Sequence, residues 1–485
     1  MSASGSSQRI APSVLIIGAG LGGIMLAILL EKMGDVDYFI LERSSSPKPL
    51  GSAMSLTPSI QVLFEQLGML EDLQKISLPF LAAKVFDDKL NCTGEIVYED
   101  QAKVIFPRPD LFNLLLSKVP KNRIAWGKRV LKLEEDTENA KDKVLVTCGD
   151  NTEFTADVVV GADGVYSSAR QNIYKVMSDK GILPKVDKEP LNVGFTCMVG
   201  LTGTMDPEKY TELKDDVAHF RSVVGGARHN WGCVNMPQNR FTWQLNLQYL
   251  DEKEAKRQQF MNSEWGPESN REMIDQFKDL PNPFGGKMSD FIDATPSELV
   301  SKVFLEHKLF KTWHYGRTVL IGDACHKFLP AGGNGAVTAF QDAVILANCL
   351  YDLEDKSAKS VKAAFQSYYE QRYPMAEKVY QMSGVLSKVI SGRAWHDRLV
   401  RWLAMTILPQ SIQKRQYVKE VAYRPQVMFL PVVDSPDMVP ALPQKPCKRY
   451  VRETREKEAL EKKNAKAQAV RRDSAVKGGE TAVAV

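Results

Sequence analysis

A short apolar run followed at once by closely spaced glycines constrains this chain more than any other feature. Val14 to Ile17 is rich in β-branched residues and predicts a buried parallel strand, while the apolar stretch from Ile24 to Leu30 predicts a helix. Between them lies Gly18-Ala-Gly20-Leu-Gly-Gly23, the Gly-x-Gly-x-x-Gly pattern. In a strand–turn–helix context these glycines predict a tight turn, a backbone that can approach a pyrophosphate, and a helix packed closely on the strand.

Glu42 supports the same interpretation. It ends the next predicted strand, Tyr38 to Leu41, and lies 19 positions after Gly23, where a carboxylate is placed to accept ribose hydroxyls. The alternative is a transmembrane helix, because Val14 to Leu30 is 17 residues long and carries no charge. Its four glycines weaken such a helix, and its length is at the short limit of about 17 to 25 residues. The sequence therefore favours a dinucleotide-binding unit.

Length and composition indicate an ordinary globular protein of two or three domains. The chain has 485 residues, 44% hydrophobic and 25% charged, and its net charge of +4 gives no reason to expect nucleic acid as a partner. Seven scattered cysteines form no Cys-x-x-Cys pair, which argues against the usual zinc and iron–sulfur spacings, so no metal is expected. They fit a reducing, cytoplasmic compartment. The polar leader, residues 1–13, does not resemble a signal peptide.

Hydrophobic periodicity changes along the chain. Residues 190–250 are rich in predicted strands, and Phe241 to Leu247 alternates apolar and polar residues most cleanly. Long helices are predicted at about 336–352 and 360–379. The tail from residue 444 is rich in Lys, Arg, Glu and Ala, which predicts a solvated helix or disorder.

Two further glycine motifs follow predicted strands. The first is Gly161-Ala-Asp163-Gly164, where Asp163 can accept from a hydroxyl or a backbone N–H. Taken alone, this motif is equally well explained as an ordinary strand–turn–helix corner. The second is Gly322-Asp323-Ala-Cys-His326, which continues into Pro330-Ala-Gly-Gly-Asn-Gly335.

In this order the three motifs resemble those of the class A, para-hydroxybenzoate-hydroxylase-like, FAD-dependent monooxygenases. The resemblance implies that the Asp163 motif serves both FAD and the nicotinamide cofactor, and that Asp323 holds the ribityl chain. It also implies that the turn through Gly335 leads into a helix near Ala336, whose N-terminus faces the flavin and stabilises negative charge on it. Asn334 and Val337 depart from the family's usual Gln and Asn.

Two other segments match the family. Arg108, just before a predicted helix, corresponds to an arginine near the pyrophosphate and ribityl chain. The loop from Pro49 to Met54, which contains Gly51 and Ala53, corresponds to a segment beside the flavin.

The resemblance covers roughly residues 12 to 380 and implies an α/β fold. The expected Rossmann-like FAD-binding domain is discontinuous, at 12–185 and 300–350, with part of 76–106 near the substrate domain. A β-rich substrate domain is inserted at 186–299. A helical C-terminal region follows at 351–431, and a charged, disordered tail at 444–485.

The resemblance also implies the reaction. NADPH or NADH reduces FAD, and O₂ then supplies one oxygen atom to the substrate. Segments 51–56 and 423–431 look like those of fungal monooxygenases of secondary metabolism, so the expected substrate is a small lipophilic molecule, a polyketide or terpenoid, that is epoxidised or hydroxylated. The alternatives are a flavin-dependent reductase or dehydrogenase of an isoprenoid and a non-catalytic flavin-bound accessory protein. A halogenase is disfavoured because no Trp-x-Trp-x-Ile-Pro segment is present.

Candidate substrate-side residues lie on the strand-rich segment that is expected to roof the flavin. They are Phe195, Arg228, His229, Trp231 and Trp243, with Arg228 as the catalytic candidate. The alternative for the three aromatic residues is plain sheet core, and for Arg228 and His229 a solvated loop. His326 is expected to make a structural hydrogen bond.

The segment 393–412 is amphipathic and edged by arginines. It predicts either packing on the catalytic core or peripheral contact with a membrane that stores a lipophilic substrate. Its uncharged stretch is too short to span a bilayer.

Overall fold

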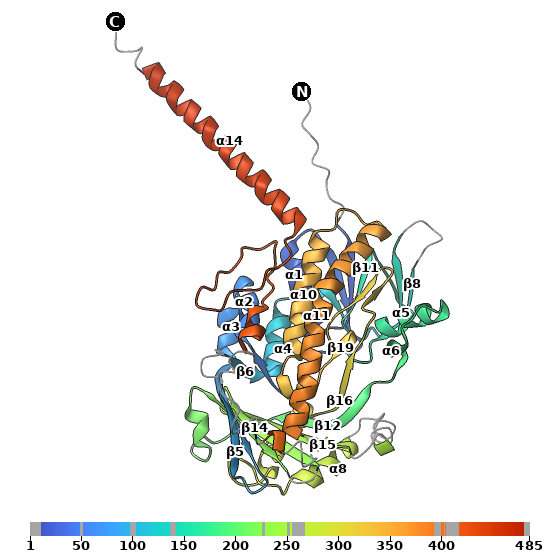
Figure 1. The fold of residues 1–485 in the computed structure, drawn as a ribbon, viewed down its shortest axis with the longest axis vertical. Helices are drawn as coiled ribbons and strands as arrows, with labels where there is room; N and C mark the ends of the chain where they lie inside the picture. The colour runs from blue at the N-terminus through green and yellow to red at the C-terminus, as the bar shows by residue number, and fades with distance from the viewer. Residues whose placement is uncertain are drawn as a thin grey trace.

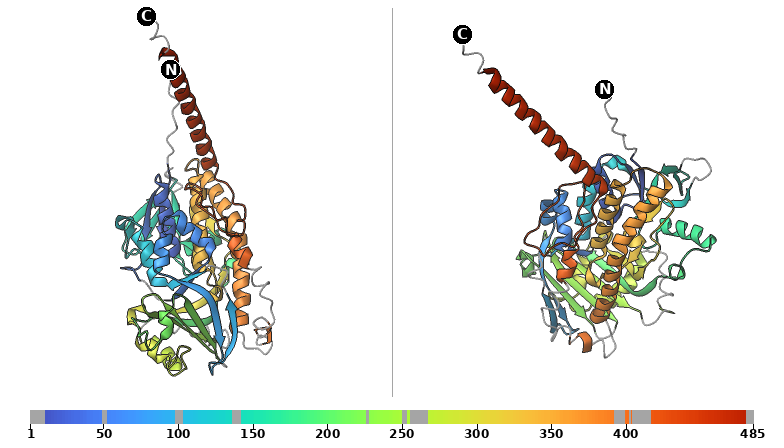
Figure 2. Two further views of the ribbon diagram at one scale, coloured as in Figure 1. Left: turned by 90° about the vertical axis from the view of Figure 1, so that its left-hand side faces the viewer. Right: turned by 45° about the horizontal axis from the view of Figure 1, so that its top comes forward.

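The computed structural model describes the chain in two bodies, one above the other in Figure 1. The described residues are 11–48, 52–97, 103–135, 142–225, 228–249, 253–254, 267–391, 399–401, 403 and 417–479. The upper body, here called the Rossmann-like body, surrounds a six-stranded sheet. The lower body, the large-sheet body, is built on a ten-stranded sheet and lies below it (Figures 1 and 2).

The six-stranded sheet is mostly parallel, and the first glycine motif leaves its central strand. Its order is β17 (His314–Tyr315), β18 (Thr318–Leu320), β11 (Val158–Gly161), β1 (Ser13–Ile17), β2 (Asp37–Leu41) and β7 (Ile124–Ala125). Only the β17–β18 pair is antiparallel. Because β1 lies between β2 and β11, the loops that follow these strands meet at one edge of the sheet.

Helices and a small sheet complete the Rossmann-like body. Its helices are α1 (Leu21–Met33), α2 (Pro58–Gln66), α3 (Leu70–Lys75), α4 (Arg108–Ser117), α5 (Ser168–Asp179), α6 (Lys185–Lys188), α10 (Gly335–Tyr351) and α11 (Ala358–Ser391). The small sheet contains β8 (Val130–Glu135), β9 (Val144–Cys148) and β10 (Glu153–Ala156). Helix α1 packs directly on α10, so Gly22 lies against Ala339. The long helices begin where the sequence predicts, but α11 continues past residue 379 and packs beside β16 through Tyr380 and His307.

The ten-stranded sheet joins strands from both ends of the chain. Its order is β19 (His326–Lys327), β16 (Ser301–Leu309), β12 (Asn192–Leu201), β15 (Arg240–Gln248), β14 (His229–Met236), β13 (Ala218–Val224), β4 (Leu78–Phe86), β6 (Val104–Pro107) and β3 (Ala53–Leu56), with β5 (Cys92–Val97) beside β4. Segment 78–86 therefore belongs to the same sheet as the inserted strands, through its parallel pairing with β13.

The two faces of this sheet have different neighbours. One face, here the outer face, is covered by α8 (Pro267–Phe277) and α9 (Ser289–Asp293), and Trp231, Trp243 and Leu245 are buried in that layer. Side chains alternate across a strand. The opposite, inner face is therefore directed toward the Rossmann-like body, which lies above the sheet in Figure 1. Arg240 of β15 confirms this direction, because it projects from the inner face and pairs with Asp110 of α4 in the Rossmann-like body.

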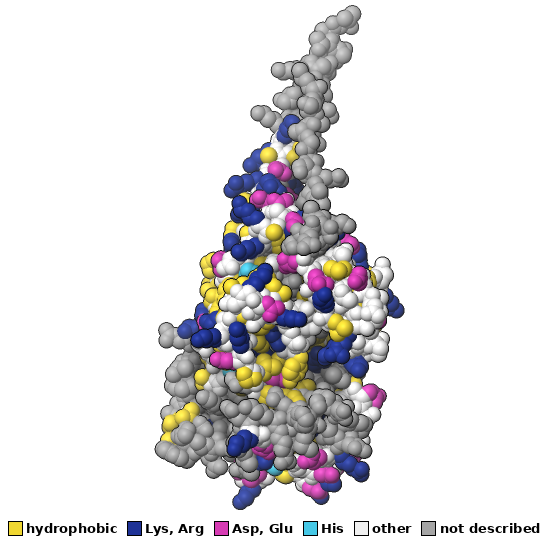
Figure 3. Space-filling view, turned by 90° about the vertical axis from the view of Figure 1, so that its right-hand side faces the viewer, with side chains coloured by type: hydrophobic (Ala, Val, Ile, Leu, Met, Phe, Trp, Pro, Cys, Tyr) yellow, Lys and Arg dark blue, Asp and Glu magenta, His cyan; other side chains and the backbone are white. Residues whose placement is uncertain are grey.

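The C-terminal segment crosses back over the Rossmann-like body before a final helix. Side-chain amides hold it: Gln66 donates to the Val427 carbonyl at 2.8 Å, and Asn348 donates to the Gln426 carbonyl at 2.9 Å. Helix α14 (Lys448–Gly479) then projects away from the body, with charged and exposed side chains over its described part (Figures 1 and 3). The sequence predicted either a solvated helix or disorder for the tail from residue 444, and the structure has a helix there, from Lys448 to Gly479. The amphipathic segment 393–412 lies outside the described residues except at 399–401 and 403.

Candidate active site

The first glycine loop is in tight contact with the Asp163 turn. Gly18 has a φ of +106°, and a Cβ there would lie 2.5 Å from the Ala162 carbonyl oxygen. A Cβ on Gly23 would lie 2.1 Å from the Gly18 oxygen, which leaves no room for a side chain. Gly20 differs, because its nearest neighbour would be 3.8 Å away. The N-terminus of α1 is therefore open beside Gly20, and its N–H groups suit a pyrophosphate.

Glu42 lies beside this loop, as the spacing predicts. Its Oε2 accepts a hydrogen bond from the Ala19 N–H at 2.8 Å, and its Oε1 accepts one from the Ser44 N–H at 2.8 Å. The carboxylate thus orders the glycine loop. Because two carboxylate oxygens offer about four lone pairs, it retains acceptor capacity for ribose hydroxyls.

The two carboxylate oxygens of Asp163 have different surroundings. Its Oδ2 accepts from the Ser168 N–H at 2.6 Å and from the Ala169 N–H at 3.2 Å, so it closes the start of α5. Its Oδ1 is buried and has no hydrogen-bond partner within the described part of the chain. Buried acceptors rarely remain unpaired in native proteins, so this oxygen fits a donor supplied by a bound cofactor.

The N-terminus of α10 is open as well. Gly333 precedes it in a left-handed conformation (φ +66°), and a Cβ there would be 3.1 Å from Ser55 Oγ. Gly335 would meet nothing within 4 Å, and no side chain caps the first turn, which contains Ala336. Val337, a departure from the family pattern, is buried and offers no polar contact.

The segment beside Ser55 reaches the same place from another part of the chain. Ala53 pairs with Pro107, and the Ser52 carbonyl accepts from the Arg108 N–H at 2.7 Å. Gly51, the other residue expected in this loop, lies outside the described residues. Burial lowers the pKa of Arg108, an effect that the charge of Asp323 opposes. Asp323 also forms an ion pair with Lys327, and although burial lowers the pKa of Lys327, this carboxylate holds it above its ordinary value. Asp323 is therefore placed between two cationic side chains.

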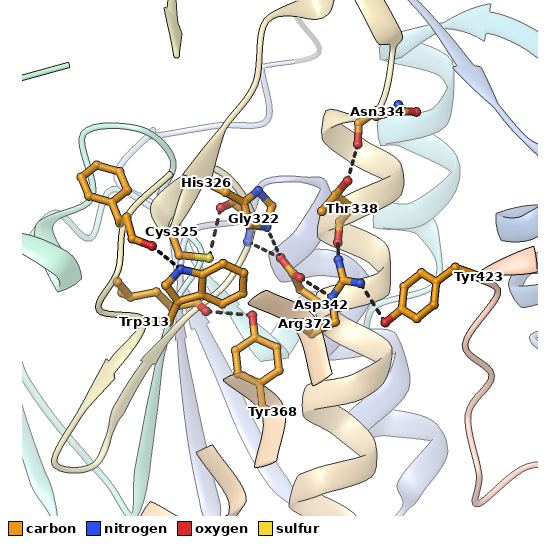
Figure 4. A network of polar contacts seen from close by, with 12 residues as sticks. Trp313, Gly322, Cys325, His326, Asn334, Thr338, Asp342, Tyr368, Arg372 and Tyr423 are labelled. Carbon is orange, nitrogen blue, oxygen red and sulfur yellow. Dashed lines mark hydrogen bonds and ion pairs between the residues drawn. The ribbon is translucent and has the colours of Figure 1, made fainter. Parts of the chain in front are cut away.

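A fully buried charge network supports the Gly322–Asp323 loop from below (Figure 4). Asp342 of α10 accepts from the Gly322 N–H at 2.9 Å, from His326 Nε2 at 2.6 Å and from Arg372 Nε at 2.7 Å. Arg372 also donates to the Tyr423 hydroxyl at 2.9 Å. Burial raises the pKa of Asp342, but His326 and Arg372 outweigh it and hold the pKa below its ordinary value. The network joins the loop, both long helices and the C-terminal segment.

Sequence reasoning found part of this network and missed Arg372. The structural hydrogen bond expected for His326 is present. Arg372 is completely buried on α11 between Tyr368 and Ala376, which are also completely buried. The four-residue spacing puts all three on one helix face. An arginine on the same helix face as apolar residues is the sequence pattern that could have indicated a buried Arg372.

Most of the residues expected to roof the flavin lie on the outer face of the large sheet. Trp231 and Trp243 are core residues of the outer face, where their ring N–H groups donate to Pro281 O and Thr295 Oγ1. His229 packs on Phe277 of α8 on that same face.

The other two candidates have different surroundings. Arg228 donates to the Gln248 carbonyl at 3.2 Å and pairs with Glu254. Phe195 is half-buried and pairs with Gln248, which puts it on the inner face with the even-numbered residues of β15.

Comparison with protein families identifies the larger part of the chain. Residues 12–383 match the model of the FAD binding domain. Among curated proteins, the chain is 27% identical over 393 residues to the FAD-dependent monooxygenase ptmM of Penicillium ochrochloron, covering 77% of this chain and 87% of that protein. It is also 27% identical over 389 residues to the FAD-dependent monooxygenase paxM of Penicillium paxilli, with 77% and 78% covered.

Solved structures share the fold. The chain resembles Klebsiella pneumoniae HpxO complexed with FAD and uric acid at a TM-score of 0.61 and 18% identity, over 84% of this chain and 96% of that one. It resembles the 2,6-dihydroxypyridine-3-hydroxylase of Arthrobacter nicotinovorans at a TM-score of 0.62 and 18% identity, over 79% and 94%. In the described part of the chain, no helix has the length and apolar character needed to cross a membrane.

Proposed function

This chain belongs to the class A FAD-dependent monooxygenase family, and we propose that it uses NADPH or NADH and O₂ to epoxidise or hydroxylate a largely apolar natural product. The proposed substrate is a polyketide or terpenoid of fungal-type secondary metabolism. FAD is its cofactor. The named relatives, which come from Penicillium, support this assignment.

One observation carries the proposal: two open helix N-termini meet one cluster of loops. The start of α1 lies beside Gly20, and the start of α10 lies at Gly335, with Asp163 and Asp323 contributed by the loops. We assign the α1 terminus to the pyrophosphate, Glu42 to the adenosine ribose, Asp323 to the ribityl chain, and the α10 terminus to the flavin ring.

The cofactor supplies the electron transfer and the activation of O₂. The chain positions the cofactor and the substrate and provides the electrostatic field around them. The partial positive charge at the start of α10 favours an anionic ring system over a neutral one. Asp342 holds the Gly322 N–H, so the buried network fixes Asp323 relative to α10. The Arg108 N–H donates to the Ser52 carbonyl, and the Arg108 guanidinium interacts with the charge of Asp323. Arg108 therefore adds a cationic side chain beside the Gly322–Asp323 loop.

Anaerobic reduction followed by oxygen tests the proposal. The purified protein is expected to carry FAD, and NADPH or NADH should bleach the flavin absorbance in the presence of an accepted substrate. Isotopically labelled O₂ should then place one labelled atom in the product. A reductase or dehydrogenase would give reduction without label, and an accessory protein would give flavin that neither nicotinamide reduces. Asp323→Ala is expected to lose FAD, whereas Gln74→Leu on exposed α3 should retain it.

Peripheral membrane contact through 393–412 is part of the same proposal. Leu399, Val400 and Leu403, the apolar members of this segment that the structure describes, are 40–47% exposed. Co-sedimentation with anionic phospholipid vesicles tests this contact. The double variant Leu399→Gln, Leu403→Gln removes two apolar contacts without adding positive charge, so it should sediment less, and equal sedimentation would contradict the contact.

A further inference from the structure

The inner face of the large sheet carries three side-chain amides that have no hydrogen-bond partner among the described residues. Asn230 of β14 is directly opposite Asn246 of β15, and Gln244 lies two residues before Asn246 on the same face. All three are half-buried. None makes a side-chain hydrogen bond to any residue in the part of the chain that the structure describes. We call Asn230, Gln244 and Asn246 the amide row.

The direction of the amide row follows from its neighbours. Trp243 and Leu245, which alternate with Gln244 and Asn246, are buried in the outer cluster under α8 and α9. Val234 belongs to the same face as Asn230, and it packs in one cluster with Ile105 of β6. Arg240, on the same face of β15 as Gln244 and Asn246, pairs with Asp110 of α4, so the row faces the Rossmann-like body.

An amide on the outer face shows what a purely structural role looks like in this sheet. Asn235 is 1% exposed, and all of its hydrogen-bonding groups are engaged. Its Nδ2 donates to the Glu212 and Val217 carbonyls, both at 3.0 Å, and its Oδ1 accepts from the His219 N–H at 2.6 Å. The amide row has no comparable contacts, although a carboxamide offers two donors and an acceptor.

The neighbours of the row are mostly apolar. Gly232 lies opposite Gln244, and a Cβ there would be 3.0 Å from the Arg221 carbonyl oxygen and 3.4 Å from Gln244 Nε2, so a side chain in place of this glycine would crowd the amide. Across β12, Gln244 pairs with Val199 and Asn246 pairs with Cys197. The nearest cation on this face of β15 is Arg240, which is already paired with Asp110 at 2.6 Å. Among the described residues of β15, this face thus offers an anionic ligand no unpaired cation, and the amide row offers neutral hydrogen bonds beside apolar side chains.

We infer that the amide row recognises neutral oxygen atoms of the substrate, so that the substrate is a molecule bearing ketone or hydroxyl groups rather than a plain hydrocarbon. This inference rests on the proposed function and deepens it. Water can satisfy the row in the ligand-free protein. A substrate without oxygen would displace that water without replacing its hydrogen bonds, which loses affinity.

Matched probes test the inference without knowledge of the natural substrate. The probes are two ketone–hydrocarbon pairs, 1-tetralone with tetralin and androstane-3,17-dione with androstane. Each is titrated into the FAD-loaded enzyme, and the change in the flavin absorbance spectrum gives its affinity. At least one ketone should bind about tenfold more tightly than its hydrocarbon, which corresponds to about 1.4 kcal/mol.

The double variant Gln244→Met, Asn246→Leu keeps side-chain volume and removes the amides. It should bind the ketone and its hydrocarbon within about twofold of each other, while Gln74→Leu should keep the wild-type preference. Equal binding of each pair by the wild type, no response to either ketone up to its solubility limit, or an unchanged preference in the double variant would overturn the inference. FAD content and reduction by NADPH or NADH are measured in the same samples. Loss of FAD or of reduction by NADPH and NADH in the wild type would count against the proposed function. If the wild type carries reducible FAD but shows no preference for the ketones, the result counts only against the role of the amide row.

Discussion

The proposed cofactor side of this protein is lined by backbone atoms, whereas the proposed substrate side is lined by side chains. Around Gly18, Gly20 and Gly335 the molecule presents backbone, with open helix ends and no side chain in the way. Across from it, the inner face of the large sheet presents side chains, namely the amide row in an apolar frame. Backbone geometry suits a cofactor that many enzymes share. Side chains can differ from one enzyme to the next without changing the fold, so they suit the recognition of an individual substrate.

The largest expected effect is on the cofactor side. Gly23→Val places new atoms against the Gly18 carbonyl, where even a Cβ would be at 2.1 Å, so it should cost about 3 kcal/mol or more of folding free energy and abolish FAD retention. The flavin-to-protein absorbance ratio after purification and chemical denaturation measure both. Gly20→Ala is the matched control, because its nearest neighbour would be 3.8 Å away, and it should fold with weakened FAD binding. A stable, yellow Gly23→Val protein would show that the loop is not so constrained.

Next in size is the buried network beneath the Gly322 loop. Arg372→Met removes the guanidinium from the buried Asp342 carboxylate, which keeps only His326 and the Gly322 N–H, and should lower the free energy of unfolding by about 3–5 kcal/mol. Urea denaturation of the FAD-loaded protein measures this loss. The Lys356–Asp157 pair, whose lysine is partly exposed, provides a contrast, and Lys356→Met should cost about 1 kcal/mol or less. Similar losses in both variants would remove the distinction between the two sites.

The same network predicts a pH dependence. The pKa of Asp342 is lower in the folded protein than its ordinary value of 3.8, despite the opposing effect of burial. Its stabilising contribution is therefore complete above about pH 4 and is lost as the pH falls through the folded-state pKa. The difference in unfolding free energy between wild type and Asp342→Asn should shrink as the pH falls below about 4. A difference that grows on acidification below about pH 4 would contradict this sign.

A smaller effect is expected where the two bodies are joined. Arg240 of the large sheet and Asp110 of α4 form a half-buried pair at 2.6 Å. Arg240→Met should lower stability by about 1.5–3 kcal/mol, the range for hydrogen bonds to charged groups, and leave the FAD content unchanged. Denaturation monitored by flavin fluorescence and by circular dichroism reports on the two bodies together. Loss of FAD at full stability would show that this pair serves the cofactor instead.

The smallest effect is expected at Arg228. Its partner Glu254 is 24% exposed and Arg228 itself is 28% exposed, so Arg228→Met should change stability by about 1 kcal/mol or less. Its contacts favour a structural role over the catalytic one that the sequence suggested, so flavin reduction should keep its wild-type rate. A large fall in the reduction rate, measured by stopped-flow with NADPH or NADH, would restore Arg228 as a catalytic candidate.

The sequence indicated the cofactor side well, because glycine has few substitutes where backbones touch. The order of Gly18, Asp163 and Asp323 along the chain predicted the Rossmann-like fold and the family, both of which the comparisons confirm. Local patterns also predicted the beginning of α10 near Ala336. In each case the information is local, since a strand, a turn and a helix follow one another within about 20 residues.

The substrate side depended on the tertiary structure. The alternation from Phe241 to Leu247 reveals a strand with two different faces, but it does not say which face is turned inward. Only the packing of α8 and α9 on Trp231 and Trp243 settles that the tryptophans form core and that Gln244 and Asn246 face the Rossmann-like body. The pairing of Asp342 with Arg372, thirty positions apart, likewise follows from how two helices pack. The sequence alone indicates where the backbone requires glycine, because these requirements involve residues close together along the chain. Which face of a strand points inward depends on packing between segments that are far apart in the sequence.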